Sequence, residues 1–205
     1  MRIDKNKIYR VDRYSFKNFV LLDRKEREMV WCWRNDERVR RWMSHSEEIP
    51  LENHLCFVDS LLFRDDLYYW LVYRDLIPVG VVDVYRIDQE NGSTEGGYYL
   101  SPEISDFGDG FEFHFYYKYF LFDILGFSML KGPLLLTNLN SYALVTFCGG
   151  KAGEFMENGG KEYVTMETLK ENFDVRKEDG NDMKKFVTHV RNCKVDWQNL
   201  LKRKK

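Results

Sequence analysis

The sequence predicts an α+β fold built on a mixed, mostly antiparallel sheet. Apolar residues recur at helical spacing in two segments before residue 64, and β-rich runs follow between residues 67 and 100. An aromatic segment too long for one strand then separates these runs from a later strand and a hairpin. Because parallel pairing needs a crossover connection, we expect it only across that segment and antiparallel pairing elsewhere.

The first half of the chain is expected to hold one strand, two helices and a three-stranded meander. A strand is expected over residues 15–22, and Asp23 is placed to cap a helix over residues 24–43. Pro50 precedes a second helix over residues 51–63. The β-rich runs that follow, separated by the turn sequences RDLIP and QENG, are residues 67–73, 79–85 and 96–100.

In the second half, the aromatic run FEFHFYYKYFLFDIL is expected to form a buried helix that ends at Gly126. An Asn-Gly-Gly sequence then marks a hairpin turn. The elements expected after the aromatic helix are a strand (129–137), a short helix (140–148), the hairpin strands (152–157 and 162–166) and a last helix (181–200).

Composition indicates a single globular protein without a nucleic-acid or metal function. The 205 residues suffice for one sizeable core, and a net charge of −2 gives no general attraction for nucleic acid. The four cysteines are widely spaced and form no C-x-x-C pair, so neither a zinc site nor a disulfide framework is expected. No apolar leader or membrane span is apparent, which favours a cytoplasmic protein with no membrane partner.

The segment SDFGDG, residues 105–110, lies between a predicted strand and the aromatic helix. Backbone N–H groups at a helix N-terminus attract phosphate, and glycines allow the backbone to approach it closely. Alone, the G-x-G pattern is more typical of an ordinary strand-to-helix loop than of a phosphate site. It is not a dinucleotide-binding fingerprint, because Phe113 stands where the third glycine belongs, and no P-loop Lys-Ser follows.

Two motifs in order resemble those of the GNAT superfamily of acetyltransferases. S-x-x-G-x-G is similar to the family loop [Q/R]-x-x-G-x-[G/A], which binds the pyrophosphate of coenzyme A. Asn140, Ala143 and Phe147 are similar to a later family motif of Asn, Ala and Tyr, which flanks the pantetheine arm. The resemblance implies a GNAT-like twisted sheet flanked by helices and acetyl-coenzyme A as the cosubstrate, and the last helix of this chain would be an extra C-terminal one. The cofactor-binding residues that it implies are Leu100, Ser105, Phe107, Gly108, Asp109, Gly110, Phe111, Asn140, Ala143 and Phe147.

A second pattern, W-R-N at 33–35 followed by V-R-R-W-M at 39–43, resembles the N-acetyltransferases of pseudaminic acid synthesis. Those enzymes acetylate the 4-amino group of a UDP-linked amino sugar, although W-R-N also occurs in ribosomal-protein and other small-molecule acetyltransferases. The same tryptophans, arginines and histidine also suit core packing, a solvated helix face or a structural hydrogen bond. The acceptor-side residues implied by position are Arg34, Asn35, Arg40, Trp42, Met43 and His54.

Acetyl transfer to an amine needs a base, donors for the carbonyl oxygen and a proton for the departing thiolate. Glu95 is the first choice as base, and Asp83 is the alternative. The family resemblance suggests that backbone N–H groups around residues 99–101 polarise the carbonyl. The proton donor is uncertain because Phe147 replaces the family tyrosine and has no hydroxyl, which leaves Tyr142, Ser141 or water.

The sequence therefore predicts an acetyl-coenzyme-A-dependent N-acetyltransferase that acts on a small-molecule amine, first of all a nucleotide-linked amino sugar. Two alternatives stay open. One is the same chemistry on a protein N-terminus, a polyamine or an antibiotic, and the other is a catalytically silent module, which Phe147 and Ser105 motivate. We expect residues 1–167 to form the acetyltransferase domain and residues 168–205 a helical extension of it, with a homodimer possible.

Overall fold

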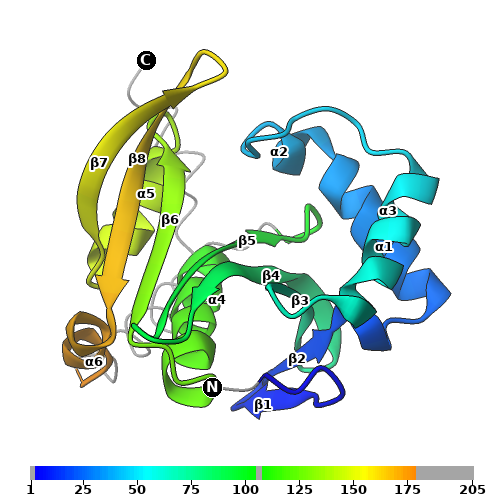
Figure 1. Ribbon diagram of the computed structural model, residues 1–205, viewed down its shortest axis with the longest axis horizontal. Coiled ribbons are helices and arrows are strands. Elements are labelled where there is room, and N and C mark those ends of the chain that lie inside the picture. The colour runs from blue at the N-terminus through cyan, green and yellow to red at the C-terminus, as the bar shows by residue number, and fades with distance from the viewer. Residues whose placement is uncertain (1–2, 105–107, 179–205) are drawn as a thin grey trace, which may run out of the picture.

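The computed structural model describes residues 3–104 and 108–178, which form one mixed sheet with helices on both faces (Figure 1). Within these residues, eight strands lie in the order β1-β2-β3-β4-β5-β6-β8-β7, and only β5 and β6 pair in parallel. The predicted α+β class is confirmed. The strands are β1 (Tyr9–Val11), β2 (Tyr14–Asn18), β3 (Leu67–Arg74), β4 (Ile77–Asp88), β5 (Ser93–Leu100), β6 (Met129–Leu135), β7 (Lys151–Asn158) and β8 (Lys161–Leu169).

The single helix predicted over residues 24–43 is wrong, because the chain breaks at Asp36. Asp23 does cap α1 (Arg24–Asn35), in a capping box with Glu26. Asp36, however, is extended, with φ −62° and ψ 133°, and its side chain accepts a hydrogen bond from the Arg38 N–H. An aspartate in this conformation caps a new helix, so the short α2 (Glu37–Arg40) starts in another direction.

The hairpins follow from local turn residues. Asp75 and Leu76 both have positive φ, which gives the two-residue turn between β3 and β4 the twist that hairpins favour. Gly159 and Gly160 do the same between β7 and β8. The strand β1 was not predicted, because three residues are too few to show a period. The strand predicted to reach residue 22 ends at Asn18 and is followed by the 3₁₀ turn η1 (Phe19–Leu21). The helix predicted to reach residue 63 is α3 (Leu51–Ser60), followed by the 3₁₀ turn η2 (Leu61–Phe63).

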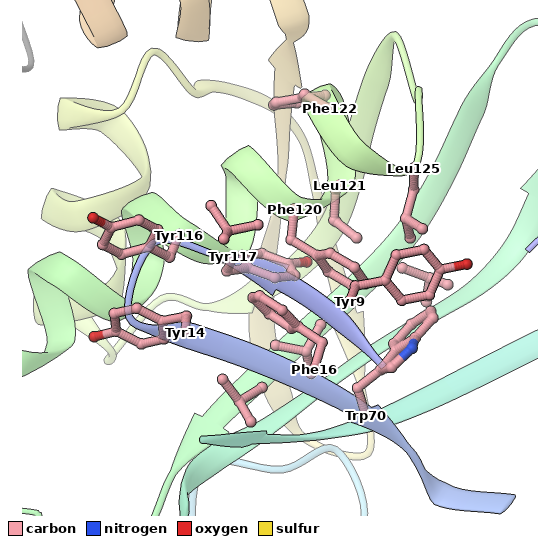
Figure 2. Close-up of a cluster of buried hydrophobic side chains, with 14 of the residues drawn as sticks. Tyr9, Tyr14, Phe16, Trp70, Tyr116, Tyr117, Phe120, Leu121, Phe122 and Leu125 are labelled. Carbon is pink, nitrogen blue, oxygen red and sulfur yellow. The ribbon is translucent and has the colours of Figure 1, made fainter. Parts of the chain in front are cut away.

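The aromatic run is a buried helix, as predicted. It forms α4 (Asp109–Tyr119) and a π-helical turn, η3 (Phe120–Ile124), and Gly126 follows with φ 82°. Its aromatic side chains pack under one face of the sheet (Figure 2). Phe120 stacks on Phe16 with ring centroids 3.9 Å apart and meets Trp70 edge-on at 5.1 Å. The crossover helix is thereby fixed beneath the strands that it connects.

The opposite face of the sheet is covered by α1 and α3 through a second core. Leu71 and Val81 from the sheet pack there against Val30, Trp33 and Val58 from the helices. Side chains of alternate residues along β4 and β5 therefore belong to different layers. None of the helices in residues 3–104 and 108–178 is both long and apolar enough to cross a membrane.

The chain ends, as far as it is described, in α5 (Leu139–Phe147), the β7–β8 hairpin and α6 (Lys170–Glu178). Asn138 caps α5, so this helix starts one residue before the predicted Asn140. α6 was not predicted, and the helix expected at residues 181–200 lies outside the described residues. Phe173 holds α6 against the core. Its side chain is fully buried, and its ring centroid lies 5.4 Å from that of Phe115 and 5.5 Å from that of Phe122.

We predict that Phe173→Ala lowers the free energy of unfolding by about 3–5 kcal/mol, because it removes a large ring from a filled core. Val175→Ala is the matched control, since Val175 lies two residues further along α6 and is 61% exposed. Urea denaturation of both variants measures the difference. Equal, small effects of the two variants would mean that α6 is not part of the cooperative unit.

Candidate active site

The sheet opens between its two parallel strands. Hydrogen bonding joins β5 to β6 only over residues 93–95 and 129–131, although the strands continue to Leu100 and Leu135. Beyond this point they diverge, and Figure 1 shows β6 leading away from β5, with α1–α3 on the far side of the opening. The two strands thus form a V-shaped opening, called the V below, whose apex is at the last paired residues, Glu95 and Lys131. A cleft of about 1310 Å³ runs through the V and is lined by residues of α1, α3, α4 and the central strands.

One edge of β5 offers its backbone to this cleft. The Gly92 carbonyl accepts from the Ser128 N–H on the β6 side, whereas the Ser101 N–H donates to the Val79 oxygen on the β4 side. Backbone groups alternate along a strand, so those of Gly96, Tyr98 and Leu100 face the opening. Of the three N–H groups expected at residues 99–101, only that of Leu100 faces the cleft. An extended ligand with amide groups can pair with this edge as another strand would.

The described end of the SDFGDG segment, residues 108–110, forms the N-terminus of α4. Gly108 is the N-cap, in the left-handed conformation with φ 92°, and the first N–H groups of α4 follow it. A Cβ on Gly110 would lie 3.7 Å from the Leu144 side chain and 3.9 Å from that of Leu100, which is ordinary contact. Ser105 and Phe107 lie outside the described residues.

The carboxylate of Asp109, beside this helix N-terminus, would repel a phosphate unless its charge were compensated. Its side chain is buried and forms an ion pair with Arg74 on β3, and Arg74 also lies 3.6 Å from Glu112. Burial lowers the pKa of Arg74, but the hydrogen bond and the charge of Asp109, together with Tyr14, outweigh it, so the pKa is raised and the charge is retained. The negative charge of Asp109 is therefore compensated inside the protein.

The second sequence motif meets the first through two aromatic rings. Phe147 of α5 contacts Phe111 of α4 edge-on, with centroids 4.9 Å apart. Asn140 and Ala143 are exposed on α5, the same helix. Tyr142 is 39% exposed and is not among the residues that line the cleft, whereas Ser141 is. The structure therefore gives no support to Tyr142 as the proton donor.

Four of the six predicted acceptor residues line the cleft: Arg34, Trp42, Met43 and His54. Arg34 donates through Nη2 to the His45 carbonyl at 2.7 Å, while its Nη1 is buried without a hydrogen-bond partner in the described chain. Burial lowers the pKa of Arg34, and the hydroxyls of Tyr99 and Tyr69 oppose this shift. Burial likewise lowers the pKa of His54, so that this imidazole is neutral.

Asn35 and Arg40 have other contacts. The Asn35 side chain both donates to and accepts from the backbone of Ile49, at 2.9 Å in each case. Arg40 forms an ion pair with Glu37 at 2.9 Å. Neither residue lines the cleft. We interpret Asn35 as a residue that fixes the loop between α2 and α3, a role that its W-R-N context alone did not reveal.

The two candidate bases differ in their surroundings, although both lie on the sheet face that α1 and α3 cover. Glu95 is paired with Arg86 at 2.9 Å, near the protein surface. Asp83 lies opposite Gly97, and its Oδ1 accepts from the Gly97 N–H at 3.0 Å. Burial raises the pKa of Asp83 to about 6, against an opposing effect of that hydrogen bond.

The mixed sheet, the V between its parallel strands and the glycine-rich helix N-terminus beside it define a GNAT acetyltransferase. The sequence matches no model of a protein family. The acetyltransferase PseH of Campylobacter jejuni serotype O:2 is 30% identical over 124 residues, which are 60% of this chain and 76% of that protein. The PseH of serotype O:23/36 is 33% identical over 94 residues, 46% of this chain and 58% of that one.

Solved structures agree on the fold. The crystal structure of Campylobacter jejuni N-acetyltransferase PseH in complex with acetyl coenzyme A has a TM-score of 0.60 at 22% identity and covers 77% of this chain and 99% of that one. Spermidine N-acetyltransferase from Vibrio cholerae, in complex with CoA and spermine, has a TM-score of 0.68 at 15% identity, covering 78% and 98%. This chain belongs to the family of the PseH acetyltransferases, and it is an acetyl-coenzyme-A-dependent N-acetyltransferase.

We predict that Gly110→Ala raises KM for acetyl-coenzyme A about tenfold, equivalent to about 1.4 kcal/mol of binding. The added methyl has room within the chain, so it obstructs only a ligand that approaches the helix N-terminus. Steady-state kinetics with each substrate varied in turn measures the effect, and thermal unfolding checks that the fold is intact. A change confined to the acceptor KM would show that this loop does not hold the donor.

Proposed function

We propose that this enzyme acetylates the amine of a nucleotide-linked amino sugar, with Asp83 as the general base. The observation that carries the proposal is the position of Asp83: a carboxylate with a raised pKa, in the cleft, on the α1–α3 face and opposite Gly97. Gly97 has no side chain, so nothing on the neighbouring strand separates the carboxylate from the opening of the V.

The donor is proposed to lie along the free edge of β5. Its pantetheine amides would pair with the backbone of Tyr98 and Leu100, and its pyrophosphate would meet the first N–H groups of α4. Two observations support a close approach of the donor to β5 and to α4. The V is narrow at its apex, since a Cβ on Gly132 would lie 3.0 Å from the Gly96 oxygen. At the start of α4, the charge of Asp109 is compensated by Arg74.

The acceptor is proposed to enter from the side of α1 and α3. Arg34 offers a buried guanidinium nitrogen to an anionic or carbonyl group, since a buried charged donor without a partner is costly unless a ligand binds it. Trp42 is 38% exposed and carries the Arg41 guanidinium 4.9 Å from its ring centre. A cationic and aromatic wall of this kind suits a nucleoside diphosphate linked to a sugar.

In the proposed reaction Asp83 accepts the proton that the amine loses as its nitrogen attacks the acetyl carbonyl. A carboxyl with a pKa of about 6 is largely ionised at neutral pH, yet it is a stronger base than an ordinary aspartate. The hydroxyls of Tyr69, Tyr85, Tyr99 and Tyr117 lie near enough to interact with this charge. The N–H of Leu100 or Tyr98 is placed to polarise the carbonyl oxygen.

We predict that Asp83→Asn lowers kcat about 10²–10⁴-fold and removes an acidic limb with a pKa of about 6 from the pH profile of kcat/KM. The same variant should be more stable at pH 7. Because the folded-state pKa is raised, the ionised carboxylate destabilises the fold, and wild-type stability falls as pH rises from about 4 to about 6.

Glu95→Gln is the comparison variant, and it should keep the acidic limb, since it removes only a carboxylate paired with Arg86. If Glu95→Gln abolished the limb while Asp83→Asn kept it, Glu95 would be the base. Rate measurements between pH 5 and 9, with thermal unfolding at each pH, distinguish the two assignments.

We predict that, with acetyl-coenzyme A and a free-thiol readout, UDP-linked amino sugars are turned over with a kcat/KM at least about tenfold above those of peptides, polyamines and aminoglycoside antibiotics. A cationic wall in the acceptor cleft attracts a diphosphate and repels a polyamine. Preferential turnover of a peptide or polyamine would refute the substrate assignment. No turnover of any amine, together with tight binding of coenzyme A by calorimetry, would instead indicate a silent binding module.

A further inference from the structure

The departing thiolate needs a proton, and the position that supplies it by family pattern is Phe147 in this chain. Phe147 is 44% exposed and has no proton to give. Tyr142, the nearest tyrosine in sequence, is not among the residues that line the cleft. A hydroxyl that replaces the family tyrosine would have to be buried, lie at the V and have no other hydrogen-bond partner.

Tyr117 of α4 has all three properties. It is 3% exposed, it lines the cleft, and its hydroxyl has no hydrogen-bond partner among the described residues. The ring is held within the buried cluster of Figure 2 and lies 5.2 Å from the Tyr98 ring. The hydroxyl lies 3.1 Å from the place where a Cβ on Gly96 would be.

Gly96 is the first residue of β5 after its pairing with β6 ends. The Tyr117 hydroxyl therefore lies beneath the apex of the V, on the α4 face of the sheet. Asp83 lies beside the next residue, Gly97, on the opposite face. A base and a hydroxyl thus flank the glycine pair from its two sides, and no side chain on the strand stands between them.

We propose that Tyr117 is the proton donor to the sulfur of coenzyme A. This role rests on the proposed donor position along β5. As the C–N bond forms and the C–S bond breaks, Asp83 takes the proton of the amine and the Tyr117 hydroxyl gives its proton to the thiolate. Transfer of the proton from Asp83 to the tyrosinate, through water in the cleft, restores both groups, and the products are the amide and the free thiol.

The surroundings of Tyr117 keep its proton in place until it is needed. Burial, and then the charge of Asp83 and the hydroxyls of Tyr98 and Tyr85, raise its pKa well above the usual value. On its own helix, His114 is neutral, because burial lowers the pKa of this imidazole well below its usual value. The phenol is therefore protonated at neutral pH. The same low-polarity surroundings favour a hydrogen bond to the developing thiolate.

The test compares Tyr117→Phe with Tyr116→Phe in the full-length enzyme, with acetyl-coenzyme A and the best amine of the substrate panel. Tyr116 is the adjacent residue of α4, but its hydroxyl bonds Asp12 at 2.5 Å and does not line the cleft. We expect Tyr117→Phe to lower kcat about 10²–10⁴-fold with little change in KM. Its Tm should be equal or higher, since the hydroxyl that is removed has no partner.

A kcat of Tyr117→Phe within about twofold of the wild type would overturn the proposal. Incorporation of a fluorinated tyrosine at position 117 separates proton donation from packing, since fluorine lowers the phenol pKa and hardly changes the shape. The fluorinated enzyme should lose kcat at high pH where the wild type does not. An unshifted profile would also overturn the proposal, even if Tyr117→Phe were inactive. Absence of wild-type turnover with every amine would count against the proposed function instead.

Discussion

The end of hydrogen bonding between β5 and β6 is the constraint on which the site depends. Two strands that separate leave backbone groups that need partners, and here those groups face the cleft rather than another element. The divergence is held open by the layers around it. Beneath the V, the buried Lys118 of α4 donates to the Thr168 hydroxyl of β8 at 2.5 Å, which ties the helix under β5 to the strand that pairs with β6.

Three groups around the V carry a cost that a bound ligand would relieve. Asp83 carries a raised pKa, Arg34 has a buried nitrogen without a partner, and the Tyr117 hydroxyl is in the same state. Each such group destabilises the fold by itself. Their gathering in one cleft of an acetyltransferase is consistent with a site whose remaining partners are its substrates.

The residues that hold the acceptor side in place are distinct from those that face it. Trp31 and Asn35 both bond the Ile49 carbonyl, at 2.7 and 2.9 Å, and so fix the end of the loop after α2. Arg34 of α1 and Trp42, which follows α2, are among the residues that line the cleft. The three successive residues of W-R-N face different sides of α1. Trp33 packs in the core, Arg34 faces the cleft and Asn35 holds the loop through Ile49.

The sequence by itself determined most of the elements, the hairpin turns, the Asp23 cap and the two motifs that indicated a GNAT acetyltransferase. These depend on neighbours within a few residues, where propensity and capping are decisive. Tertiary structure alone decided that Asp83 lies opposite Gly97, that Tyr117 reaches Gly96 and that Asp109 pairs with Arg74. Such contacts follow from strand register and from the packing of α4 under the sheet, and no local pattern in the sequence records either.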